Sequence, residues 1–151
     1  MTIGIINMKD KETAEEVWAL QHAAYRAEAE LIGFADLPPL RDTVESLRAS
    51  EERFCGMRSP DGELAGAVSY EPADGGYVVC RLMVHPDRFR QGVGSRLLAY
   101  VLALHPEAEW TVTAADRNRP ALTLYAKAGF RPCGTFEPSP GIRLVRLRRT
   151  P

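Results

Sequence analysis

The stretch from Arg81 to Leu98, with the sequence RLMVHPDRFRQGVGSRLL, predicts a strand, a loop and a helix in immediate succession. The β-branched and apolar run from Val78 to Val84 suits a buried strand. Pro86 ends this strand, because proline has no backbone N–H to donate to a neighbouring strand. Gly92 and Gly94 then open a helix. Its apolar residues recur at helical spacing: Val93, Leu97, Leu98, Val101 and Leu102.

The start of this helix is suited to binding an anion. The first backbone N–H groups of a helix have no internal acceptor, and the helix dipole is positive at that end. Gly92 and Gly94 let a ligand approach the main chain closely, so the loop predicts a phosphate site. A dinucleotide-binding loop is the alternative. It would need a third glycine where Leu97 stands, although Asp116 follows the next strand and could contact a ribose.

Composition indicates one domain, residues 1–151. With 151 residues and 45% hydrophobic content, such a chain buries roughly 70% of its unfolded surface. The formal net charge of -1 argues against a nucleic-acid partner, which would require a basic face. No run approaches the ~20 apolar residues of a membrane span, and the N-terminus lacks an apolar signal core. We therefore expect a cytoplasmic protein with no membrane partner.

Smaller sequence features suggest no metal site and no disulfide framework. The three cysteines form no C-x-x-C pair and are expected to be small buried residues, and the three histidines show no i, i+4 pairing. The basic cluster from Arg143 to Arg149 is typical of a solvated strand at a sheet edge, with a phosphate or partner patch as the alternative.

The remaining chain predicts short strands and helices in the order βααβββ-αβαββ. Thr13 and Glu16 form a capping box that starts a long helix through about Gly33. The other predicted elements are strands at 2–7, 53–58, 63–71, 77–84, 110–115, 130–136 and 142–147, and helices at 42–49 and from Asn118 to just before Gly129. Hairpin strands followed by alternating strands and helices predict an α+β domain with a mixed sheet and helices on both faces.

The long first helix carries two stripes. One is apolar, and the second contains Trp18, Gln21, Tyr25 and Glu28. The second stripe fits a helix between core and solvent. It also fits the wall of an acceptor pocket, because clefts combine apolar walls with a few placed polar groups.

Two motifs resemble the GNAT superfamily of N-acetyltransferases. Residues Phe89 to Gly94 read FRQGVG, which is similar to the family's acyl-CoA signature Q/R-x-x-G-x-G/A after a strand. Both glycines match, Phe89 takes the leading position, and Arg90 and Gln91 follow it. The segment Asn118-x-x-Ala121-x-x-x-Tyr125-x-x-x-Gly129-Phe130 resembles the family's helix that begins at an asparagine and ends at Gly-Phe.

This resemblance implies a mixed, mostly antiparallel sheet of about seven strands and an acetyl-CoA co-substrate without a metal. The pyrophosphate would rest on the amides that begin the central helix, and the pantetheine arm would pair with the preceding strand like an added strand. A main-chain N–H near Leu82 would polarise the thioester carbonyl. The implied coenzyme contacts are Leu82, Met83, Val84, Arg90, Gln91, Gly92, Val93, Gly94, Ser95, Asn118 and Tyr125.

The catalytic roles follow from the same resemblance. Tyr125 is the candidate general acid toward the departing thiolate, although it also belongs to an apolar helix stripe. An attacking amine must be neutral, whereas a free alkylamine with a pKa near ~10 is mostly protonated at neutral pH. We predict Glu71 as the base, with Glu28, Asp116 or proton removal through ordered water as alternatives.

The resemblance implies acetyl transfer to the amine of a small molecule, by direct attack in a ternary complex. Tyr25 and Glu28 are the candidate acceptor contacts, and a homodimer is possible. Two alternatives remain open: a non-catalytic module that binds acyl-CoA, and a peptide or protein N-acetyltransferase.

Overall fold

The computed structural model describes residues 1–151. The chain forms β1 (Thr2–Ile5), α1 (Lys11–Ile32), η1 (Pro38–Arg41), α2 (Val44–Ala49), β2 (Arg53–Arg58), β3 (Leu64–Ala73), β4 (Gly76–Val84), η2 (Pro86–Arg88), α3 (Val93–Leu104), β5 (Trp110–Ala115), α4 (Arg119–Lys127), β6 (Arg131–Ser139) and β7 (Ile142–Arg149). The two short 3-10 helices, η1 and η2, are the elements that the sequence patterns did not indicate.

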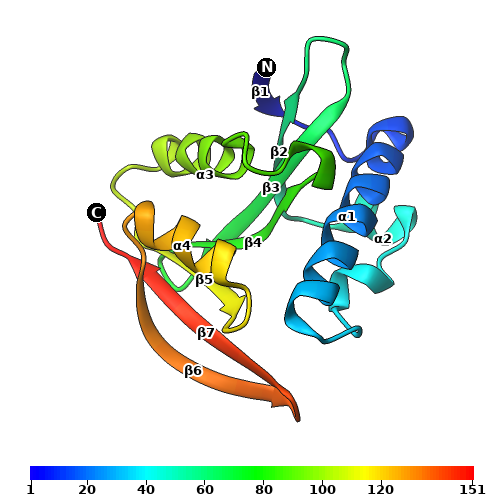
Figure 1. The fold of residues 1–151 in the computed structure, drawn as a ribbon. Helices are drawn as coiled ribbons and strands as arrows, with labels where there is room; N and C mark the ends of the chain where they lie inside the picture. The colour runs from blue at the N-terminus through cyan, green and yellow to red at the C-terminus, as the bar shows by residue number, and fades with distance from the viewer.

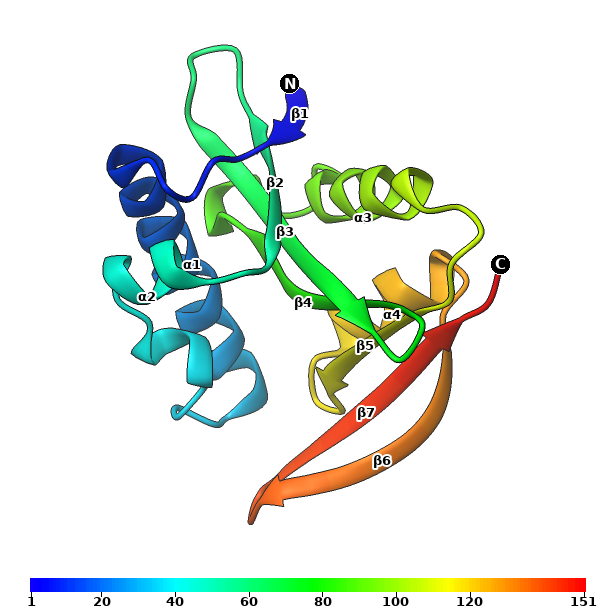
Figure 2. The same cartoon turned by 180° about the vertical axis from the view of Figure 1, so that it is seen from behind.

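The strands form one sheet in the order β1-β2-β3-β4-β5-β7-β6. Neighbouring strands are antiparallel except β4 and β5, which are parallel. The predicted α+β fold with a mixed sheet of about seven strands is therefore confirmed. The predicted edge position of Arg143–Arg149 is wrong, because β7 folds back between β5 and β6 and leaves β6 at the edge. Figures 1 and 2 show the β6–β7 hairpin projecting beyond the helices.

Helices cover both faces of the sheet. Helices α1 and α2 lie on one side, and α3 and α4 lie on the other (Figures 1 and 2). The larger core cluster is built on α3, whose buried residues Leu97, Leu98 and Val101 pack with Trp110 and Leu147 of the sheet. A smaller cluster joins α1 and α2 to the opposite face.

Helix α1 begins differently from the prediction. Asp10 is the N-cap, and its carboxylate accepts hydrogen bonds from the backbone N–H and the hydroxyl of Thr13 at 3.1 and 2.7 Å. Thr13 thus lies inside the helix, and Glu16 instead pairs with Arg58 at 2.8 Å. A carboxylate at the N-cap satisfies the same free amides that the capping box would have satisfied.

The three cysteines do not share one environment. Cys55 is buried, Cys80 is half-buried and Cys133 is exposed on β6. The prediction of three buried cysteines is therefore wrong for Cys133, because every residue of this edge strand is exposed to solvent.

Candidate active site

Strands β4 and β5 diverge, and the candidate site lies at the gap that opens between them. They pair only at their beginnings, where Tyr77 lies opposite Trp110 and Val78 opposite Thr111. The backbone from Val79 to Val84 therefore has no strand neighbour on that side. A bulge at Cys80 further disrupts the strand, since Ser69 pairs with Arg81 and Tyr70 with Val79. The open edge includes the predicted coenzyme contacts Leu82, Met83 and Val84.

The loop after β4 presents free backbone N–H groups. Gly92 is the N-cap of α3 in the left-handed conformation (φ 77°), and Arg90 has the same conformation (φ 65°). Alternating left- and right-handed residues turn successive N–H groups toward one concavity that suits an anion. The first backbone hydrogen bond of α3 runs from the N–H of Arg96 to the carbonyl oxygen of Gly92, at 3.0 Å. The N–H groups of Val93, Gly94 and Ser95 remain available, and this arrangement fits a diphosphate.

Two glycines let α3 pack closely behind this loop. A Cβ on Gly94 would lie 3.0 Å from Leu124 of α4. A Cβ on Gly66 of β3 would lie 2.7 Å from Val93 and 2.8 Å from the carbonyl oxygen of Met83. Gly66 was missed in the sequence because it stands alone within a strand pattern.

A hydrogen bond joins α1 to α4 across the site. The side-chain N–H of Asn118 donates to Glu28 Oε1 at 3.0 Å, and Asn118 Oδ1 accepts from the N–H of Ala121 as the N-cap of α4. Arg117 also donates to the carbonyl oxygen of Ile32, the last residue of α1, at 3.0 Å. The C-terminal half of α1 is thereby held beside the β5–α4 connection, and Glu28 and Asn118 are brought together.

Burial changes the acid–base properties of this group. It raises the pKa of the Glu28 carboxyl, while the hydrogen bond from Asn118 acts in the opposite direction. Burial and then the charge of Glu28 raise the pKa of the Tyr125 hydroxyl. The pKa of Tyr25 is raised by burial, then by Glu28 and by Tyr125, so these residues form one interacting group.

Tyr125 is only 5% exposed, and its ring packs edge-on against Phe130 with the centroids 5.6 Å apart. The Tyr125 hydroxyl makes no hydrogen bond within the protein. It is nevertheless not a fully buried polar atom without a partner, because His22 Nε2 is the only side-chain atom of that kind. The Tyr125 hydroxyl therefore retains a small exposed surface although the residue is buried.

The other predicted base candidates lie elsewhere. Glu71 pairs with Val78 in the β3–β4 ladder, and no ion pair joins its carboxylate to a basic side chain. It lies near the Cys80 thiol, whose pKa is raised to about 12 by burial and then by the charges of Glu52 and Glu71. Asp116 follows β5, and its N–H donates to Arg143. No hydrogen bond joins either carboxylate to Asn118 or Tyr125.

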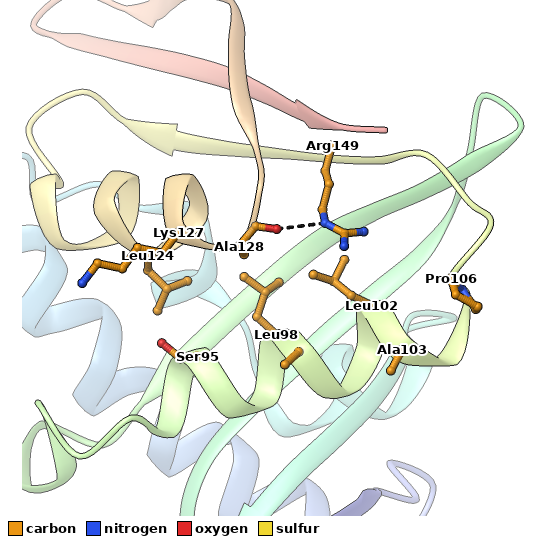
Figure 3. Close-up of a pocket in the computed structure, with 10 residues that line it drawn as sticks. Ser95, Leu98, Leu102, Ala103, Pro106, Leu124, Lys127, Ala128 and Arg149 are labelled. Carbon is orange, nitrogen blue, oxygen red and sulfur yellow. Dashed lines mark hydrogen bonds between the residues drawn. The ribbon is translucent and has the colours of Figure 1, made fainter. Parts of the chain in front are cut away.

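A groove of about 440 Å³ lies between α3 and α4. Figure 3 shows Ser95, Leu98 and Leu102 of α3 facing Leu124 of α4 and Ala128, which follows the last residue of that helix. Arg149 closes the far side, where its Nε donates to the carbonyl oxygen of Ala128 at 2.9 Å. The groove is mainly apolar and begins at Ser95, one of the predicted phosphate contacts.

Residues 50–132 match the model of the acetyltransferase (GNAT) domain. The chain belongs to the GNAT acetyltransferase family. This GNAT protein is 41% identical over 143 residues to UPF0157 protein YqkA of Bacillus subtilis (strain 168), covering 94% of this chain and 41% of YqkA. It is 45% identical over 80 residues to the mycothiol acetyltransferase of Clavibacter sepedonicus, covering 49% of this chain and 25% of that protein. The chain therefore spans well under half the length of these relatives.

Solved structures show the same fold at low sequence identity. The ribosomal-protein-S18-alanine N-acetyltransferase of Escherichia coli superposes with a TM-score of 0.76 at 14% identity, covering 98% of this GNAT chain and 92% of its own. An aminoglycoside 6'-N-acetyltransferase complexed with coenzyme A gives 0.75 at 16% identity, covering 99% and 97%. Their named acceptors, a protein and an antibiotic class, differ widely, so the fold does not define the acceptor.

Two negative observations complete the description. No group of three or more His, Cys, Asp or Glu side chains is arranged to hold a metal ion. No helix combines the length and the hydropathy that crossing a membrane requires.

Proposed function

We propose that this chain transfers the acetyl group of acetyl-CoA to the amine of a small molecule. The observation that carries the proposal is the contact of Glu28 with Asn118, beside Tyr125, at the gap between β4 and β5. This places a carboxylate and a phenol together near the open strand edge that would hold the thioester. The phosphate loop lies at the end of the same strand.

Glu28 is the base in this proposal. An incoming ammonium must lose a proton before its nitrogen can attack the thioester carbon, and Glu28 takes that proton directly or through one water. Burial raises the pKa of Glu28, which brings this carboxyl closer to neutral pH and makes it a better proton acceptor than an exposed glutamate. Glu71 is the alternative base. It lacks a contact with the Asn118–Tyr125 pair.

Tyr125 is the acid. The new C–N bond forms as the C–S bond breaks, and the Tyr125 hydroxyl donates to the sulfur that leaves. Because burial and the nearby Glu28 raise the pKa of Tyr125, this hydroxyl keeps its proton throughout the neutral range. The free N–H groups along β4 would polarise the carbonyl, as a main-chain donor aimed at a developing oxyanion does.

The rest of the coenzyme has a continuous path in this proposal. The pantetheine arm lies along Leu82–Val84, the diphosphate on the amides of residues 91–95, and the nucleotide end in the apolar groove that starts at Ser95. Two features support a small cationic acceptor: the carboxylate of Glu28 and the phenol of Tyr25 on the half-buried inner side of α1.

The test measures thiol release from acetyl-CoA with a panel of amines, aminoglycosides and peptides, together with coenzyme affinity. We expect turnover with a small amine. Tyr125→Phe should lower kcat by about 100-fold or more while the Kd of acetyl-CoA changes less than twofold. Glu28→Gln should lower kcat/KM and remove its rise with pH, because the base is active only above its pKa.

Glu71→Gln is the matched control for Glu28→Gln, since it also replaces a glutamate by glutamine, on β3 beside β4. A large loss in Glu71→Gln with an active Glu28→Gln would transfer the role of base to Glu71. Tight coenzyme binding without thiol release for any acceptor would instead indicate a non-catalytic acyl-CoA module. Turnover of peptides alone would indicate a peptide or protein acetyltransferase.

A further inference from the structure

A buried ionic network surrounds Arg81 on β4. Its Nη1 lies 2.6 Å from Asp42 Oδ2 and 2.9 Å from Gln21 Oε1. Its Nε and Nη2 lie 3.1 and 3.3 Å from the two carboxylate oxygens of Glu52. The side chain of Arg81 is 14% exposed, and those of Asp42 and Glu52 are 20% and 17% exposed. One guanidinium therefore connects β4 to three other segments.

The partners of Arg81 also make hydrogen bonds to other groups. The amide nitrogen of Gln21, a residue with no exposed surface, donates to Asp42 Oδ2 and to the carbonyl oxygen of Pro39, both at 2.8 Å. The Ser69 hydroxyl donates to Glu52 Oε1 at 2.6 Å. A buried ion pair whose carboxylate oxygens all accept hydrogen bonds fixes one arrangement of its elements, although it is not by itself a strong source of stability.

The elements fixed by this network are those that carry the proposed chemistry. Tyr25 and Glu28 follow Gln21 by one and two turns on the same face of α1. Arg81 directly precedes Leu82, where β4 has its open edge. The network therefore sets the distance between the helix that presents the base and the strand that would hold the thioester.

We propose that Arg81 is a positioning residue for acetyl transfer, which holds α1 and the η1–α2 segment in register with the open edge of β4. This inference rests on the proposed function. Arg81 touches neither substrate in this proposal and acts only through the elements it joins. A displacement of the base by about 1 Å can reduce the rate by up to 10²-fold. The rate therefore depends on the exact position of α1 relative to β4.

Arg58 provides a matched control. It also joins the sheet to α1, with its Nη1 and Nη2 2.8 and 3.0 Å from the two oxygens of Glu16. This pair lies near the start of the helix and is partly exposed, at 35% and 42%. It links the same two parts of the molecule without passing near Tyr25 or Glu28.

The experiment compares Arg81→Lys with Arg58→Lys in the full chain, well below the melting temperature. Lysine keeps the charge, so the fold is retained, but its single ammonium cannot reach Asp42, Gln21 and Glu52 together. We expect Arg81→Lys to lower kcat/KM for the amine about tenfold, through both kcat and the acceptor KM, with the Kd of acetyl-CoA within twofold. Arg58→Lys should leave all three within twofold. Amide exchange in residues 21–28 should accelerate in Arg81→Lys alone.

Equal kinetics in the two variants, or an equal loss of coenzyme affinity and acceptor turnover in Arg81→Lys, would overturn the positioning role. A wild-type chain that releases no thiol would instead refute the proposed function. In that case unchanged amide exchange of α1 in Arg81→Lys would still count against the register role of Arg81.

Discussion

In the proposed function, the donor side of the site, which would hold acetyl-CoA, and the acceptor side, which would hold the amine, are built in different ways. The donor side, formed by β4, the loop to α3 and the start of α3, presents backbone groups whose direction depends on left-handed residues at 90 and 92. The acceptor side, formed by α1, η1 and α2, depends on side chains that meet from distant positions, such as Arg81 with Gln21 and Asp42. A phosphate needs N–H groups of any residue type. An acceptor needs particular side chains, which can vary while the donor side stays the same.

The largest effect that tests this difference is expected at Gly92. A β-branched residue is strained at φ 77°, and holding valine there costs about 2 kcal/mol, so Gly92→Val should raise the Kd of acetyl-CoA about 30-fold. Titration calorimetry measures this change. Gly75 is the matched control because it also has a positive φ, of 82°, and open space around it, in the β3–β4 turn. If Gly75→Val weakened coenzyme binding equally, the effect would come from general destabilisation.

The same difference explains what could be predicted from the sequence. The loop with free N–H groups at the start of α3 could be predicted because two glycines follow a strand within a few residues and open an apolar helix. The seven strands and their order along the chain could also be predicted from local patterns, but their order in the sheet could not, because β7 lies between β5 and β6. The network of Arg81 could not be read, because its partner Gln21 is 60 residues away and each member resembles an ordinary polar residue.

Glu28 is a second residue whose contacts could not be predicted from the sequence. Its place on the first helix was predicted, but its contact with Asn118, 90 residues away, needs the fold. Burial, which raises its pKa, cannot be read from neighbouring residues either. The sequence favours Glu71 as the base because its strand lies beside the central strand. This local argument does not locate the carboxylate relative to Tyr125.

An effect of intermediate size is expected on the thermal stability of the Glu28→Gln variant. Because burial raises the pKa of Glu28, the folded chain holds more protons than the unfolded chain between about pH 4.3, the ordinary value, and the raised value. The contribution of Glu28 to the free energy of unfolding is therefore full below this window and falls as the pH rises through it. Glutamine keeps the oxygen that accepts from Asn118 and carries no charge to desolvate.

We therefore expect Glu28→Gln to raise Tm by about 2 °C at pH 7.5 and to leave it unchanged at pH 4, as measured by calorimetry. A Glu28→Gln variant with a higher Tm and a lower kcat/KM would show that the buried carboxylate destabilises the fold and is needed for turnover. Glu71→Gln should change Tm by less than about 1 °C at either pH. A lower Tm for Glu28→Gln at pH 7.5 would mean that the ionised carboxylate is stabilised in the folded chain.

The smallest effect is expected at Arg90, where backbone and side-chain contributions to the donor side can be separated. Arg90→Gly removes the cation and leaves a residue that adopts φ 65° without strain, whereas Arg90→Ala removes the same cation and retains the strain. If the N–H groups carry phosphate binding, Arg90→Gly should raise the Kd of acetyl-CoA less than threefold, about 0.6 kcal/mol, and Arg90→Ala should raise it more. Titrations at two salt concentrations check the charge contribution, because a side-chain contact with phosphate is screened by salt. A 30-fold loss in Arg90→Gly with a steep dependence on salt would place the binding in the arginine side chain, and the donor side would then resemble the acceptor side in depending on a particular residue.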